Sequence, residues 1–217
     1  MLTAFADKIA ARIVGFCAVV LIALAATAGI AWAAYTDNMY PTQYANAGCF
    51  SEEPNARQST CRTDNATLTY YMDSGGEFEL ETPDRDDVRA TMSSDYNPTD
   101  LSVSYDSTPS FSGSAETDII YQEGSADIPS SVDGMTWCNN ASDLDKCDQQ
   151  YVRIRGAGSY TRGLACHETG HAVGLVHGNV SSPMKTNTDT RLGCMVTPVG
   201  STTSLGSNNI ENINNTY

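Results

Sequence analysis

The stretch "ACHETGHAVGLVHG", residues 165–178, contains all three histidines of a chain of 217 residues. His167 and His171 are four positions apart, and His177 follows six positions later. Residues four apart lie one turn apart on the same face of an α-helix. The spacing therefore predicts a helix over residues 159–173 that points the first two imidazoles in the same direction.

The residues after this helix favour a third ligand. Gly174 can adopt a positive φ without steric cost, so it can end the helix and turn the chain sharply. His177 can then swing back beside His167 and His171. Three neutral imidazoles suit Zn²⁺ and leave its fourth position for water, which is the pattern of a catalytic zinc. Glu168 is adjacent to the first ligand, so it can reach a group on the metal without binding the metal itself.

The segment "HETGHAVGLVH", residues 167–177, resembles the H-E-x-x-H-x-x-G-x-x-H signature of metzincin metalloproteases. The chain looks like a small, secreted, bacterial-type, matrixin-like member of that family. The motif covers eleven residues, and the order of expected strands and helices over residues 66–217 fits the same fold less specifically. The resemblance implies a zinc endopeptidase in which Glu168 is the general base. A polypeptide substrate would lie extended along an edge strand near residues 135–140.

The resemblance also implies a Met-turn, a tight turn whose methionine lies beneath the metal. Met195 is preferred, because its neighbouring cysteine and the proline that follows resemble reprolysin-type members. Met184 is the alternative, because its distance from the third histidine is near that of compact matrixins. If Met195 lies under the metal, Cys194 approaches Cys166 in the helix, and a disulfide between them is expected. The wall of the S1′ pocket is expected from about residues 195–205.

A zinc-binding, non-proteolytic interaction module is the alternative function. Holding zinc needs only the histidines, so the presence of Glu168 favours the protease. A further alternative is the same protease retained at a membrane by an uncleaved N-terminus.

The N-terminus has the composition of a targeting segment. Lys8 and Arg12 precede an uncharged, apolar run over residues 13–36, and small residues stand at the ends of Ala31-Trp32-Ala33. This pattern is typical of a secretory signal peptide over residues 1–34. An uncleaved membrane anchor facing outside is the alternative, since the run is long enough to span a bilayer. The prediction is a secreted protein that has no membrane contact after signal cleavage.

Six cysteines remain after the expected signal peptide, an even number that indicates disulfides in an exported chain. The close spacing of Cys49 and Cys61, and of Cys138 and Cys147, favours two local disulfides. Residues 35–65 are polar and form either part of the mature domain or a short pro-region.

Hydrophobic periodicity predicts an α/β fold for the catalytic domain, residues 66–217. The expected architecture is a mixed, mostly parallel twisted sheet with an active-site helix and a C-terminal helix. The expected strands are 66–72, 100–106, 117–123, 135–140 and 150–156, with a helix at 82–96. The inner face of the last helix is expected to be Leu205, Ile210 and Ile213.

The charge is strongly acidic, with a net value of −14. Fifteen Asp and Glu against two Arg lie between Asp73 and Asp133. Nucleic acid is therefore excluded as a partner, because phosphate binding needs clustered Lys and Arg. The acids predict a solvated face that keeps a monomeric, exported protein soluble. A Ca²⁺ site within residues 73–87 is the alternative, since Ca²⁺ prefers oxygen ligands.

Overall fold

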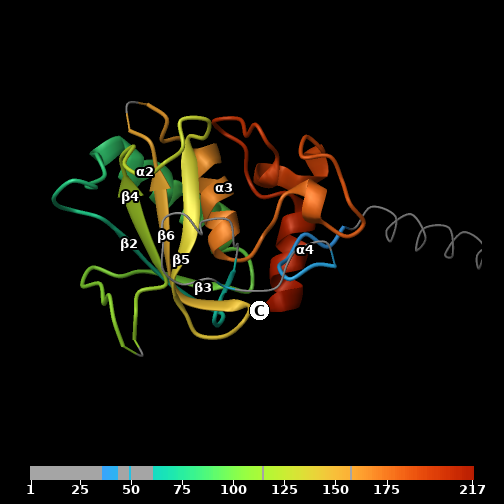
Figure 1. The fold of residues 1–217 in the computed structure, drawn as a ribbon, viewed down its shortest axis with the longest axis horizontal. Coiled ribbons are helices and arrows are strands. Elements are labelled where there is room, and N and C mark those ends of the chain that lie inside the picture. Colours follow the sequence, from blue (N-terminus) through green and yellow to red (C-terminus); the bar gives the residue numbers. More distant parts are fainter. Residues whose placement is uncertain (1–35, 44–48, 50–60, 114, 157) are drawn as a thin grey trace, which may run out of the picture. The chain divides into compact units, whose positions relative to one another are not determined.

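The computed structural model describes residues 36–43, 49, 61–113, 115–156 and 158–217, and Figure 1 shows their arrangement. The described residues from Thr36 onward belong to one compact unit. The expected signal peptide or anchor, residues 1–34, lies outside the described residues. Within the described part, no helix combines the length and the apolar character that a membrane span requires.

The sheet has six strands in the order β1-β6-β4-β2-β3, with β5 paired to the other side of β6. All pairs are parallel except β5 with β6, which are joined by a short connection and run antiparallel. The predicted mostly parallel α/β sheet is therefore confirmed. The strands are β1 (Arg62–Thr63), β2 (Thr67–Met72), β3 (Ser102–Tyr105), β4 (Ile119–Glu123), β5 (Gly134–Ala141) and β6 (Lys146–Ile154).

The core lies between one face of this sheet and two helices, α2 (Thr82–Thr91) and α3 (Arg162–Ala172), which lie side by side behind it in Figure 1. Alternate residues of a strand point to one face, and in β2 these are the buried Leu68, Tyr70 and Met72. Helix α2 belongs to the crossover between the parallel strands β2 and β3, which places it on the apolar face, and α3 follows the last strand and packs beside α2.

The predicted helix over residues 82–96 changes character midway. After α2 the chain makes a π-helical turn, η1 (Met92–Tyr96), in which the Asn97 amide donates to the Met92 carbonyl. Pro98 follows and has no amide hydrogen, so the helix cannot continue. Tyr96 ends this turn fully buried, with its hydroxyl donating to the carbonyl of Cys166 in α3.

Two other predicted boundaries were wrong by a few residues. Helix α3 begins at Arg162 rather than 159, because the Thr161 hydroxyl accepts the Leu164 amide and caps the helix there. Strand β6 begins at Lys146 rather than 150, because its first residues pair with β1, a strand too short to stand out in the sequence.

The C-terminal helix, α4 (Ser207–Thr216), exists as predicted, with Ile213 fully buried and Leu205 packed against the core. It also contacts an N-terminal strap, defined here as residues 36–42. The Thr36 amide donates to Asn208 Oδ1 at 2.8 Å. The described parts of the 35–65 segment thus pack in the same unit as the sheet, through this strap and through β1.

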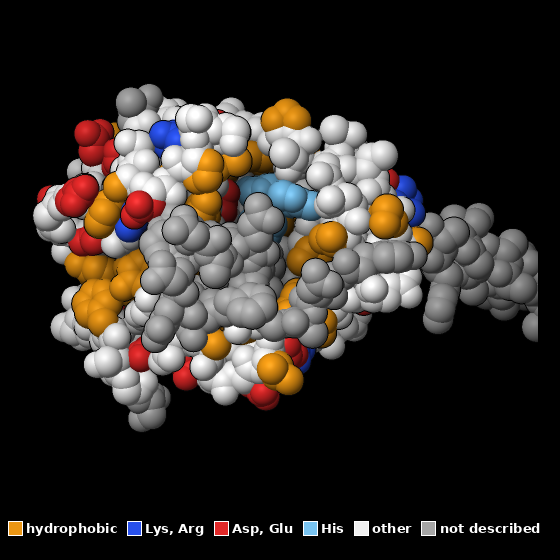
Figure 2. Space-filling model, viewed as in Figure 1, with side chains coloured by type: hydrophobic (Ala, Val, Ile, Leu, Met, Phe, Trp, Pro, Cys, Tyr) orange, Lys and Arg blue, Asp and Glu red, His pale blue; other side chains and the backbone are white. Residues whose placement is uncertain are grey.

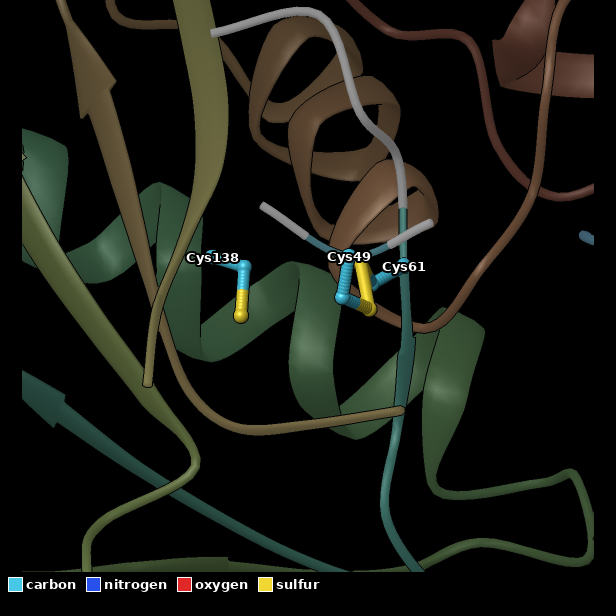
Figure 3. Close-up of side chains that lie close together, drawn as sticks. All are labelled: Cys49, Cys61 and Cys138. Carbon is cyan, nitrogen blue, oxygen red and sulfur yellow. A yellow bond between two sulfur atoms is a disulfide. The ribbon is translucent and has the colours of Figure 1, made fainter. Parts of the chain in front are cut away.

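Two disulfides lie close together beside β1, β5 and β6. Cys49 pairs with Cys61 and Cys138 with Cys147, with Cα atoms 5.6 Å and 5.8 Å apart. Figure 3 shows the first bond and the nearby Cys138, and these residues form a small apolar cluster. Both predicted local pairings are present. Because these sulfurs are in disulfides, the cluster offers no thiolate for a metal.

Candidate metal centre

Helix α3 and the loop after it bring the three histidines together. The Nε2 atom of His177 lies 3.0 Å from Nε2 of His167 and 3.1 Å from Nε2 of His171. A tetrahedral zinc with bonds of about 2.0–2.1 Å would separate such nitrogens by about 3.3 Å. The structure therefore places all three predicted ligands around one point at which a metal ion could be held.

The turn that returns His177 depends on Gly174, which has a φ of 99°. A Cβ atom there would lie 2.7 Å from Cβ of Arg62 and 2.9 Å from Sδ of Met39. Both the left-handed backbone and this close packing favour glycine. The sequence predicted the conformational reason, while the packing against β1 and the strap is visible only in the structure.

Hydrogen bonds of the Nδ1 atoms fix the tautomer of two of the three imidazoles. His167 Nδ1 lies 2.7 Å from the Cys194 carbonyl, and His171 Nδ1 lies 2.8 Å from the Leu175 carbonyl. A carbonyl only accepts hydrogen bonds, so each Nδ1 carries the hydrogen and each Nε2 presents a lone pair. A hydrogen bond from the ring nitrogen that faces away from the metal orients metal-bound histidines in the same way.

Burial keeps the histidines neutral. Removal from water, together with the nearby His177, lowers the pKa of His167 to about 4. Desolvation also lowers the pKa of His171 well below its usual value, and lowers that of His177. At neutral pH the cluster is therefore three uncharged bases with converging lone pairs, the form that binds a cation.

Glu168 lies in the same cleft but is held by strand β5. The Thr136 hydroxyl lies 2.9 Å from its Oε2 atom and 2.8 Å from its main-chain carbonyl. Burial raises the pKa of the carboxyl to about 7, and the Thr136 hydrogen bond acts in the opposite direction. Such a carboxyl can both accept and release a proton near neutral pH.

The two methionine candidates have different environments. Met195 is fully buried, and its Sδ atom occupies the space beside Gly170, where a Cβ would lie 2.3 Å away. Cys194, the residue before it, is bonded to Cys166 with Cα atoms 6.0 Å apart, which is the third predicted pairing. Met184 is 55% exposed. The structure thus places Met195, and not Met184, against the helix that carries the histidines.

The histidines open into a cleft of about 1020 Å³. Figure 2 shows them at its surface. One side is formed by the start of β5 and the other by residues 197–201, which lie within the wall expected at 195–205. Tyr40 of the strap also lines the cleft, a position that no sequence pattern predicted. The lining residues include Asp133, Gly134, Met135, Thr136, Leu164, Val176, Asn179, Thr197, Pro198, Val199 and Ser201.

The acids of residues 73–87 are not brought together in the same way. In the part of the chain that the structure describes, the three histidines form a group that could share a metal ion, and the acids of residues 73–87 form none. Asp84 instead lies beside Glu123, and burial together with this neighbour raises its pKa to about 7. The structure thus offers no such group for the alternative Ca²⁺ site.

No protein-family model matches this chain, and no curated protein matches it. The fold and the site together define an α/β protein with three disulfides and a three-histidine group that could hold a metal ion in an open cleft.

Proposed function

We propose that the chain is a zinc-dependent endopeptidase of the metzincin type. The observation that carries the proposal is the convergence of the Nε2 atoms of His167, His171 and His177, with Glu168 in the same cleft. Three imidazoles with an open fourth position are typical of catalytic zinc. The H-E-x-x-H-x-x-G-x-x-H pattern supports the same choice.

When bound, Zn²⁺ supplies a Lewis acid that polarises a scissile carbonyl and brings the pKa of a water molecule to about 7. Glu168 accepts one proton from the attacking water as its oxygen bonds to the carbonyl carbon. The same carboxyl then delivers that proton to the leaving amine as the C–N bond breaks. A pKa near 7 suits both steps, because the group must change its protonation state twice in each cycle.

The proposed substrate is an extended polypeptide. Strand β5 pairs with β6 on one side, and no strand covers its other side among the described residues. Gly134, Met135 and Thr136 of this strand line the cleft. An extended peptide can therefore add to the edge through main-chain hydrogen bonds, with Val199 and its neighbours forming the S1′ wall. One protomer contains all of these groups, so a monomer suffices.

Three disulfides indicate an extracellular or otherwise oxidising environment. Secretion through cleavage of residues 1–34 is the proposal that fits this indication. Retention by an uncleaved anchor is the alternative, and the intact mass of the exported protein distinguishes the two.

The replacement Glu168→Gln tests the proposal. It keeps the size of the side chain and removes the base, so zinc should stay at about one equivalent while peptide hydrolysis falls roughly 10²–10⁴-fold. Hydrolysis of a peptide library with and without a chelator gives the reference activity. Wild-type activity in the variant would contradict the assigned role. Zinc binding without any hydrolysis by the wild type would favour a non-proteolytic zinc module.

A further inference from the structure

We infer that Thr136 is a positioning residue that orients the carboxylate of Glu168, and that Gly134 leaves the space this carboxylate occupies. The inference rests on the proposed function. Both residues belong to β5, the strand expected to bind substrate, and neither belongs to the histidine motif.

The contacts of Thr136 reach the helix at two points. Its hydroxyl lies 2.9 Å from Oε2 of Glu168 and 2.8 Å from the main-chain carbonyl of the same residue. Its own backbone is fixed in the sheet opposite Val152 of β6. The hydroxyl therefore connects a rigid strand to the side chain and the backbone of the proposed base.

Gly134 lies two residues before Thr136 in β5, so it faces Glu168 from the same side of the strand. A Cβ atom on Gly134 would lie 2.6 Å from Oε1 and 2.9 Å from Cγ of Glu168. The carboxylate thus has one oxygen beside the Thr136 hydroxyl and the other over a position without a side chain. Any larger residue there would force the carboxylate to move.

A glutamate side chain has several rotatable bonds, so an unrestrained carboxylate would occupy several positions. The contacts with Thr136 and Gly134 limit it to one of them. A general base must lie within hydrogen-bond reach of the proton that it takes, and small displacements of positioned groups cost large factors in rate. Holding Oε2 on Thr136 leaves Oε1 for the attacking water. It also ties the position of the base to the strand that aligns the peptide.

The principal test is the replacement Thr136→Val, which keeps the β-branched shape and removes the hydroxyl. A hydrogen bond to a charged group is worth roughly a 10–100-fold change in equilibrium. We expect kcat to fall by about that factor, while KM stays within about twofold and zinc stays at one equivalent. Thr136→Ser retains the hydroxyl and should restore most of kcat. Thr67→Val, at an exposed position of β2 outside the cleft, is the matched control.

A double-mutant cycle separates positioning from simple support of the fold. If Thr136 acts through the carboxylate, Thr136→Val should have almost no further effect on kcat in a Glu168→Gln background. A purely structural role would instead give the same loss in both backgrounds, together with a lower melting temperature.

Gly134→Ala provides an independent variant, and we expect it to lower kcat with zinc retained. Gly75→Ala, whose Cβ would meet nothing within 4 Å, is its control. Full kcat in Thr136→Val and Gly134→Ala, with Glu168→Gln inactive, would overturn this inference and leave the proposed function standing. A wild-type protein without peptidase activity would overturn both.

Discussion

At the scale of single residues, the site depends on which nitrogen of each imidazole carries the hydrogen. The carbonyls of Cys194 and Leu175 take the Nδ1 hydrogens of His167 and His171. Leu175 lies within the motif, four residues after His171, whereas the Cys194 carbonyl could not be identified from the motif because it lies 27 residues beyond His167 and reaches it only through tertiary packing. The two carbonyls are the groups that orient the predicted ligands.

The replacement His171→Ala should remove most of the zinc. Its imidazole is one of the three converging bases, and two histidines leave the tetrahedral site incomplete. Metal analysis of protein purified without chelators should find about one zinc per wild-type chain. Met184→Leu, at an exposed position away from the cluster, should retain that amount. Full zinc in His171→Ala would show that the ligand set is wrong.

At the scale of elements, the loop that carries His177 lies between α3 and the N-terminal strap. Asn38 of the strap is fully buried and donates to the Val176 carbonyl at 3.0 Å. Its Oδ1 accepts from Nδ2 of Asn212 at 2.8 Å and of Asn208 at 3.1 Å. These bonds connect α4 to the residue before His177.

Replacing Asn38 by Ala should therefore destabilise the protein and the metal loop together. Unpairing a buried polar group costs about 1–3 kcal/mol for each partner left unsatisfied. We expect a lower melting temperature and weaker zinc binding, measured by competition with a chromogenic chelator. Asn215→Ala, at an exposed position of α4, should change neither quantity. Unchanged zinc affinity in Asn38→Ala would contradict the proposed link.

The Cys166–Cys194 disulfide joins α3 to η3 (Thr190–Met195), the segment that ends at the buried methionine. This disulfide closes a loop whose ends are 28 positions apart in the sequence, whereas the ends of the Cys138–Cys147 loop are 9 positions apart. In the chain-entropy model these loops contribute about 3–4 and about 2–3 kcal/mol respectively. Replacing both cysteines of either pair by Ala should lower the free energy of unfolding by those amounts in denaturant titrations.

Only the loss of the longer disulfide should also weaken zinc binding, because the Cys194 carbonyl orients His167. An equal loss of zinc affinity in both double variants would show that the effect comes from general destabilisation.

At the scale of the whole molecule, the buried ionisable groups couple stability to pH. The folded, metal-free protein holds the histidines neutral, with the pKa of His167 at about 4, whereas an unfolded histidine titrates near 6.5. Below pH 6.5 the unfolded state therefore binds more protons, and stability falls as pH falls. Glu168 and Asp84, whose pKa values are each raised to about 7, act in the opposite direction.

The contribution of neutral His167 to stability, about 3 kcal/mol, should thus be lost in metal-free protein as pH falls from about 6.5 to 4. Thermal melting at several pH values measures this loss. With zinc bound, protons must compete for the same nitrogens, so the metal should be retained below pH 6.5 and released towards pH 4. An identical pH dependence of melting in metal-free wild type and in metal-free His167→Ala would contradict the assigned burial of His167.

The sequence alone predicted most elements of this protein and the group of three histidines that could hold a metal ion. The period of apolar residues located the strands and helices, because each element must bury one face. The spacing of His167, His171 and His177 around Gly174 predicted their convergence, because helix geometry and glycine conformation act over a few residues.

Tertiary structure decided what depends on segments distant in the chain. The Thr136 hydroxyl on Glu168, the strap beside the His177 loop and Met195 beneath Gly170 all join residues at least 25 positions apart. Local periodicity carries no information about such contacts, since they follow from how the sheet and helices pack. The short strand β1 and the π-helical turn after α2 escaped prediction for the same reason: their hydrogen bonds or packing partners lie elsewhere in the fold.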